Sequence, residues 1–177
     1  MSTTPSRLDE DRALVLLAAG GVEPLAGVPG RDDALPAYNG LLDPPGVEQL
    51  GIELATRARE LDPSVVLIWE RPEDVALAHV VGRELGLSVV RAFDADGLVG
   101  HGPGIEPGSR VLLVADAVRD GHIVRAAWAL AEQLEGTLVG TAVLLATPAL
   151  DEVADQAGRI VCLVRPPASG ESDGATR

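Results

Sequence analysis

Lysine is absent from this chain of 177 residues, and all 14 of its basic residues are arginines. This absence excludes a lysine Schiff base and the lysine of a phosphate-binding P-loop. Aromatic residues make up only 2% of the sequence, so the core must be built from valine, leucine, isoleucine and alanine. The single cysteine, Cys162, cannot form an internal disulfide, and its place in the apolar run 160–164 predicts an inert core residue.

The sequence also lacks long apolar runs. No stretch is long enough to span a membrane, and the short run at 14–19 follows acidic residues, unlike a signal peptide. We therefore expect a cytoplasmic protein with no membrane partner. The net charge of −13 argues against a nucleic-acid partner, because non-specific binding needs a basic surface. The same charge repels a polyanionic substrate unless a local pocket or a divalent metal reverses the field.

Apolar runs and helical stripes alternate along the chain, which indicates an α/β fold with a doubly wound, mainly parallel five-stranded sheet flanked by helices. A single domain is expected over 7–166, with disordered ends at 1–6 and 167–177. The expected strands are 65–69, 87–91, 111–114, 137–145 and 159–164, and the expected helices are 8–19, 46–61, 75–85, 123–135 and 149–157.

The stretch 110–128 organises the chain. It joins a buried strand to a helix through a short turn, 115–121, that carries Asp116, Arg119 and Asp120. A strand that ends in a tight turn and leads into a helix N-terminus is where open α/β sheets bind ligands, phosphates above all.

This stretch resembles the signature of type I phosphoribosyltransferases. In that signature an aliphatic strand ends in two adjacent acids, two aliphatic residues and a loop of Thr-Thr-Gly-Gly-Thr type. Here Ala115 and Asp116 stand at the two acid positions, so one acid is missing. The loop 119–123 keeps one glycine, Gly121, and has no hydroxyl side chain. The resemblance implies a phosphoribosyltransferase-like domain with a small N-terminal hood segment at 22–45.

The same resemblance implies the roles of the site residues. Asp116 would hold the ribose hydroxyls of phosphoribosyl pyrophosphate and, in an active enzyme, help to bind Mg²⁺ bridging to the diphosphate. Family members are commonly dimers, so a homodimer is possible. The residues expected to contact the phosphates and the sugar are Arg119, Asp120, Gly121 and His122 after the signature strand, and Glu70 and Arg71 in the turn at 69–74.

The segment 92–108 is expected to be a long loop, and orotate-type members carry their flexible catalytic loop at this place. His101-Gly102 matches the pair found in that loop, so His101 is a second candidate catalytic residue. The turn at 69–74 is less suitable for a diphosphate. It has no glycine, Pro72 removes one amide donor, and three acids surround Arg71.

Some polar residues have simpler interpretations. Aspartate is a preferred N-cap residue, so Asp120 is expected to cap the helix that follows it. Its carboxylate would then accept hydrogen bonds from backbone amides that a phosphate would otherwise bind. Tyr38, in the hood, is expected to pack down rather than to recognise a base, and His79 is expected to be a core residue with one hydrogen bond.

Three functions stay open on this sequence. The first is a phosphoribosyltransferase-like protein that binds a phosphoribosyl or nucleotide ligand with reduced or altered catalysis. The second is an active enzyme that transfers a phosphoribosyl group to orotate or a purine base. The third is a non-catalytic interaction module. Retained ligand binding separates the first two from the third, and product formation separates the second from the first.

Overall fold

The structure is a computed structural model that describes residues 8–21, 38–40, 42–96 and 98–165. The ends expected to be disordered, 1–6 and 167–177, lie outside the described residues, as does most of the expected hood. Within the described part, no helix is long and apolar enough to cross a membrane.

A mixed six-stranded sheet forms the centre of the protein, in the order β3-β2-β1-β4-β5-β6. All neighbouring strands are parallel except β2 and β3, which are antiparallel. The strands are β1 (Val65–Trp69), β2 (Val89–Ala95), β3 (Leu98–His101), β4 (Arg110–Ala117), β5 (Thr137–Leu145) and β6 (Arg159–Val164).

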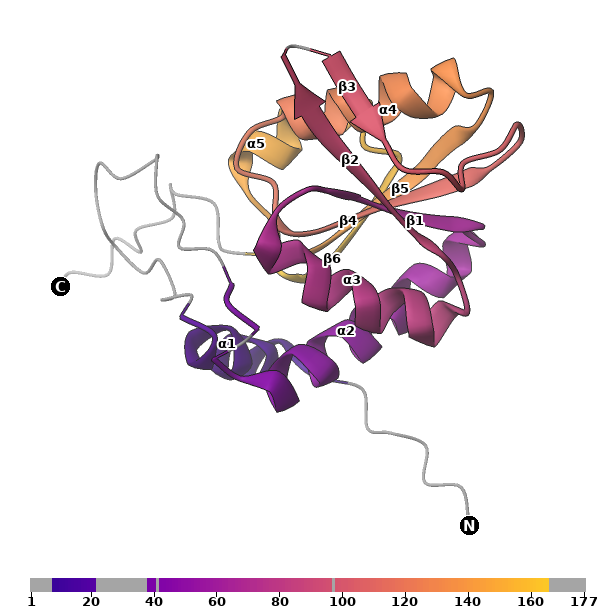
Figure 1. Ribbon diagram of the computed structural model, residues 1–177. Helices are drawn as coiled ribbons and strands as arrows, with labels where there is room; N and C mark the ends of the chain where they lie inside the picture. Colours follow the sequence, from indigo (N-terminus) through magenta and orange to yellow (C-terminus); the bar gives the residue numbers. More distant parts are fainter. Residues whose placement is uncertain (1–7, 22–37, 41, 97, 166–177) are drawn as a thin grey trace, which may run out of the picture.

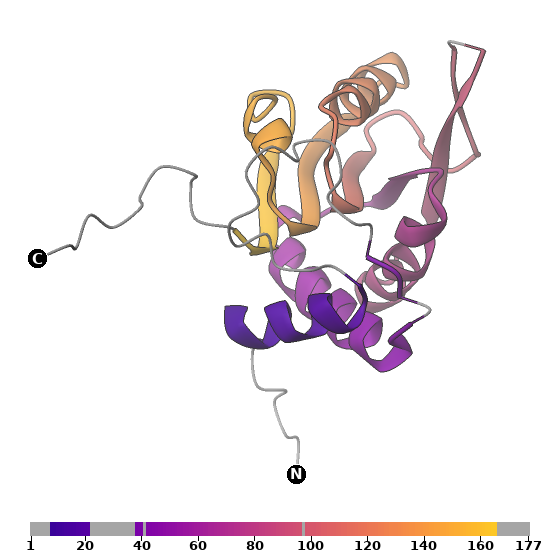
Figure 2. The same ribbon diagram turned by 90° about the vertical axis from the view of Figure 1, so that its left-hand side faces the viewer.

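Helices cover both faces of the sheet (Figures 1 and 2). One apolar cluster joins α1, α2 and α3 to one face, and a second cluster joins α4 and the region of α5 to the other. The doubly wound α/β architecture expected from the sequence is therefore confirmed. The helices are α1 (Glu10–Ala19), α2 (Pro44–Ala58), the 3₁₀ turn η1 (Arg59–Leu61), α3 (Pro72–Leu85), α4 (His122–Gln133) and α5 (Pro148–Asp151).

The segment 92–108 was expected to be a loop, and this expectation is wrong for its first half. Strand β2 continues to Ala95 and pairs with the additional strand β3, from Ala92↔His101 to Ala95↔Leu98. The ring of Phe93 lies across Gly100, where a Cβ would fall 2.4 Å from the Phe93 Cε2 atom. The dipeptide Asp96-Gly97 is a typical hairpin signal, and Asp96 has a left-handed φ of 53°.

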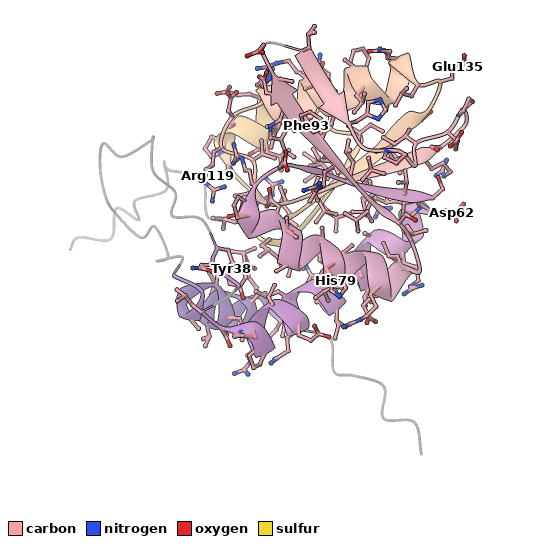
Figure 3. The ribbon with its side chains drawn as sticks, viewed as in Figure 1. Tyr38, Asp62, His79, Phe93, Arg119 and Glu135 are labelled. Atoms are coloured by element: carbon pink, nitrogen blue, oxygen red, sulfur yellow. The ribbon has the colours of Figure 1, made fainter. Side chains whose placement is uncertain are left out.

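Two further expectations need correction. His79 is exposed rather than buried, because the buried stripe of α3 runs through Asp74, Leu77, Ala78 and Val81 and leaves His79 on the outer side (Figure 3). The turn expected at 115–121 is shorter than predicted, because β4 continues to Ala117.

Candidate functional site

The centre of the sheet is a topological switch point. From the neighbouring strands β1 and β4 the chain runs outward in opposite directions, through α3 to β2 and through α4 to β5. Open α/β sheets bind ligands outside the carboxyl ends of strands at such a point. We call the residues there, 69–74 after β1 and 115–122 after β4, the carboxyl-edge site. Both turns contain residues predicted to contact a ligand.

Asp116 is the most highly engaged residue of this site. Its side chain is only 2% exposed. One carboxylate oxygen, Oδ2, accepts a hydrogen bond from the Tyr38 amide at 2.9 Å, and Oδ1 accepts one from the Ala117 amide at 2.6 Å. These two amides hold the carboxylate in one orientation at the end of β4.

The guanidinium of Arg119 pairs with the same carboxylate through both of its terminal nitrogens. Nη1 donates to Asp116 Oδ1 at 2.8 Å, and Nη2 donates to Oδ2 at 2.7 Å. This is the strong two-bond geometry of arginine with a carboxylate. In Figure 3 Arg119 and Tyr38 lie on the side of the molecule where β4 ends. The residue predicted to hold the ribose thus has its charge matched from within the chain.

A second buried acid contacts the backbone of Asp116. Asp74, in the first turn of α3, is fully buried and accepts a hydrogen bond from the Asp116 amide at 2.8 Å. Beyond Leu67↔Leu113 no pair between β1 and β4 continues the ladder, so this carboxylate satisfies an amide near the end of β4. The sequence gave no signal for this contact between Asp74 and β4.

Tyr38 is packed into the core, as expected, and its side chain is fully buried. Its ring fills the space beside Gly20, where a Cβ would fall 2.0 Å from the Tyr38 Cε2 atom. Burial, and then the charge of Asp43, raise the pKa of the Tyr38 hydroxyl to about 12. The backbone of Tyr38, rather than its hydroxyl, therefore connects this segment to Asp116.

The loop between β4 and α4 is built from structural contacts. The Asp120 carboxylate accepts a hydrogen bond from the His122 amide at 2.8 Å, and Gly121 is the N-cap residue. A Cβ on Gly121 would fall 2.6 Å from Val153, so close packing against 153 requires glycine here. The hydroxyl of Thr147 donates to the Val118 carbonyl and fixes the start of the loop. Asp120 therefore precedes the N-cap residue, and the expected N-cap position of Asp120 is wrong, although its carboxylate does take an amide at the N-terminus of α4.

Apolar and aromatic groups occupy the side of the site next to α4. Ala115, at the position of the missing acid, is 1% exposed and belongs to the apolar cluster under α4. Trp69 packs against that cluster, and its ring meets the His122 ring edge-on with centroids 5.9 Å apart. A carboxylate at 115 would be buried among apolar groups, which is strongly unfavourable without a partner.

The two charged residues that follow Trp69 differ in their contacts. Glu70 forms an exposed ion pair with Arg91 of β2, at 3.0 Å. Arg71 is the N-cap residue of α3 and is partly exposed, and no ion pair or hydrogen bond of its guanidinium is found among the described residues. Arg71 is thus a cation that an anionic ligand can meet without breaking an existing pair.

His101 lies away from the other candidates. It pairs with Ala92 of β2, and Ala92 pairs with Trp69 of β1, while Asp116 lies one strand further, on β4. Three strand spacings amount to roughly 14 Å between the backbones of β3 and β4. The ring of His101 is exposed, and its Nδ1 atom lies 2.8 Å from the Gly102 carbonyl oxygen. The observed arrangement does not bring His101 and Asp116 to one reacting atom.

The described residues do not form a protein-held magnesium site. No group of three or more histidine, cysteine or acidic side chains is gathered there in a way that could hold a metal ion. Both oxygens of Asp116 already accept hydrogen bonds, from Arg119 and two amides. Magnesium that accompanies phosphate ligands is usually held by one or two carboxylates together with the phosphates. The single carboxylate at the end of β4 does not fit this role while Arg119 occupies it.

The architecture and the switch-point site define a class: this is the fold of type I phosphoribosyltransferases. The adenine phosphoribosyltransferase of Rhodothermus marinus superposes with a TM-score of 0.68 at 19% identity, covering 88% of this chain and 99% of that one. The orotate phosphoribosyltransferase of Mycobacterium tuberculosis, solved with inorganic phosphate, superposes with a TM-score of 0.65 at 20% identity, covering 88% of each chain. The resemblance noted in the sequence is thus confirmed at the level of the fold.

Sequence comparison points to one kind of relative. The chain is 37% identical over 106 residues to the adenine phosphoribosyltransferase of Xanthomonas oryzae pv. oryzae, which covers 59% of this chain. The match spans 54% of that relative, so it extends over about half of the curated protein. No protein-family model matches the chain.

Proposed function

We propose that this protein binds a phosphoribosyl or nucleotide ligand at the carboxyl-edge site, with catalysis that is reduced or altered relative to a phosphoribosyltransferase. The observation that carries the proposal is the buried carboxylate of Asp116, held by two amides at the end of β4 and paired with Arg119. Its position at the switch point supports ligand binding, and its existing partners support the altered chemistry.

Charge near the site supports an anionic ligand. The chain carries a net charge of −13, but Arg71 and Arg119 are both placed at the carboxyl-edge site. Arginine is well suited to phosphates because its planar guanidinium donates two parallel hydrogen bonds. The ligand would approach Arg71 from the β1 side and Arg119 from the β4 side.

Three features support reduced or altered catalysis. Ala115 replaces an acid and is part of the apolar core, so that position offers no group to the sugar. Asp120 takes the His122 amide that a phosphate could otherwise use. Asp116 must exchange partners before it can accept hydrogen bonds from a ligand. Each feature removes a contact that would stabilise a transferring phosphoribosyl group.

A second candidate is an active adenine phosphoribosyltransferase. The observation in its favour is the 37% identity over 106 residues to proteins of that name. On this proposal adenine would be the base, Asp116 would be a catalytic residue, and Mg²⁺ would be held mainly by oxygens of the ligand. His101 would take part only if the hairpin of β2 and β3 moved toward Asp116. A cytoplasmic location and a homodimer belong to both proposals; the location is an expectation from the sequence, and the homodimer follows from the family resemblance alone.

A thermal-shift titration with phosphoribosyl pyrophosphate and Mg²⁺, and separately with AMP, tests for binding. A ligand at about 100 times its dissociation constant stabilises the folded state by about 2.7 kcal/mol. For a domain of this size, that raises the melting temperature by roughly 5–10 °C. A shift without product from adenine or orotate supports the first proposal, and product formation supports the second. No shift at millimolar ligand contradicts both and leaves an interaction module.

Arg71→Gln provides a site-specific test with a matched control. The change removes a cation from the carboxyl-edge site, so it should weaken binding of phosphoribosyl pyrophosphate by about tenfold, the effect of losing roughly 1.4 kcal/mol. Arg159→Gln is the control, because Arg159 starts β6 at the opposite edge of the sheet and forms only an exposed pair with Glu60 at 3.6 Å. Equal affinities of both variants and the unmodified protein would remove Arg71 from the site.

A further inference from the structure

We propose that Arg119 is an internal counter-ion that makes the carboxyl-edge site selective for phosphorylated sugars. A ligand phosphate draws the guanidinium away from Asp116, and only then does the Asp116 carboxylate accept hydrogen bonds from ligand hydroxyl groups. A nucleoside has the hydroxyls but no phosphate, so it cannot make this exchange. The inference rests on the proposed binding of a phosphoribosyl or nucleotide ligand.

The contacts of Asp116 show which partner stays and which can leave. Its carboxylate is 2% exposed and is held by the Tyr38 and Ala117 amides, at 2.9 and 2.6 Å. The side chain of Arg119 is 22% exposed. A guanidinium with access to solvent can turn outward around its own side-chain bonds, whereas the acid is fixed by the backbone of two segments. The exchange therefore moves Arg119 and leaves Asp116 in place.

The other charged side chains near the β4–α4 loop offer less to an anion than Arg119 does. Asp120 and Arg125 lie 4.0 Å apart and are both largely exposed, so their charges offset each other. Asp120 also accepts the His122 amide, so that amide is not open to a phosphate. A phosphate at this loop therefore gains most from Arg119, and it must compete with Asp116 for it.

Removal of Arg119 from Asp116 without replacement is unfavourable, because a buried charge that loses its partner is strongly destabilised. A neutral sugar offers only hydroxyl groups to the carboxylate and supplies no anion to Arg119 in exchange for Asp116. A sugar phosphate supplies both missing partners at once, an anion for Arg119 and hydroxyls for Asp116. The state in which Arg119 is paired with Asp116, the self-paired state, thus lowers the apparent affinity for every ligand. For a phosphorylated ligand, the new contact between the phosphate and Arg119 offsets this loss of affinity, whereas a ligand without a phosphate has no such contact.

AMP and adenosine are a suitable pair of probes, because they differ by one phosphate group. Binding of both to the full-length protein is measured by isothermal titration calorimetry, and melting curves verify that each variant folds. If the self-paired state exceeds the open state by about 100-fold, adenosine should bind at least about 100-fold more weakly than AMP. Arg119→Gln should tighten adenosine by up to about 100-fold, because the self-paired state is lost, and should weaken AMP, so the preference for AMP collapses.

Arg125→Gln is the matched control, since it removes the same charge from the neighbouring exposed pair with Asp120. Its preference for AMP should stay within about threefold of the unmodified protein, the range expected for a weak surface pair. Arg119→Lys is a second variant in case the glutamine variant does not fold. Lysine keeps the charge but cannot form the two-bond pair, so adenosine should bind more tightly while AMP binding is retained.

The outcomes distinguish this inference from the proposed function. If Arg119→Gln weakens AMP and leaves adenosine unchanged, Arg119 is an ordinary phosphate ligand and the inference is wrong. An equal gain for both ligands would also overturn it, because the arginine would then block the site without being recruited. If neither the unmodified protein nor any variant binds AMP or adenosine, the proposed function fails and this inference fails with it.

Discussion

Replacement of Asp116 by asparagine should destabilise the protein by about 3 kcal/mol, even though the two side chains have nearly the same shape. The carboxylate is 2% exposed and accepts four hydrogen bonds, two from Arg119 and two from the amides of Tyr38 and Ala117. Asparagine offers one acceptor oxygen instead of two and directs an NH₂ group at donors.

The magnitude follows from what remains unpaired. Removal of one partner from a buried ion pair costs about 3–5 kcal/mol. Arg119 is 22% exposed and can turn toward water, so the loss of its ion pair should cost no more than the lower end of this range, about 3 kcal/mol. One of the two amides also loses its acceptor, which adds about 1–3 kcal/mol if no side-chain rotation compensates. Because these contributions overlap, we expect about 3 kcal/mol in total, or a drop in melting temperature of roughly 6–12 °C.

Urea unfolding of Asp116→Asn is measured beside Asp151→Asn as a control. Asp151 also accepts two hydrogen bonds from one arginine, Arg165, at 2.9 and 3.1 Å, but both side chains are about half exposed. The control should therefore lose less than about 1 kcal/mol. A loss below about 0.5 kcal/mol for Asp116→Asn would refute our account of the site, since only an exposed or loosely paired acid behaves in that way.

Three further predictions use the same unfolding assay. Tyr38→Phe should leave stability unchanged or raise it by up to about 1 kcal/mol at pH 7, because the buried hydroxyl has no hydrogen-bond partner among the described residues. With the pKa of Tyr38 raised from 10.0 to about 12, the unfolded state ionises first, so the unmodified protein should lose up to about 2.7 kcal/mol between these pH values. The phenylalanine variant should lack that part of the loss, and an equal loss in both proteins would contradict the assignment. Gly20→Ala should destabilise by about 1–3 kcal/mol, because its methyl group would meet the Tyr38 ring at 2.0 Å, and a neutral result would show that the ring can move aside. Asp120→Ala should lose about 1 kcal/mol with its bond to the His122 amide, and no loss would show that this bond does not stabilise the N-terminus of α4.

The strands that follow from the sequence are those made of continuous apolar runs. β1, β5 and β6 have the predicted bounds, since a strand covered by helices on both faces must be apolar throughout. Helix α3 ends at Leu85 as expected, where Gly86 closes it in a left-handed conformation, but it starts at Pro72, three residues before the expected start. The hairpin of β2 and β3 was missed because its residues are largely exposed and form no apolar run.

The sequence alone determined that this is a doubly wound α/β protein, and it predicted a candidate site with Asp116 and Arg119 after the central strand. Only the tertiary structure decided which groups of the chain contact these residues. Asp116 is held by Tyr38, 78 residues away, and its amide binds Asp74, 42 residues away. The spacing of apolar residues in the sequence indicates which face of a helix or strand is buried. It does not record which distant donor meets a buried carboxylate, because any amide brought there by the packed fold can satisfy it.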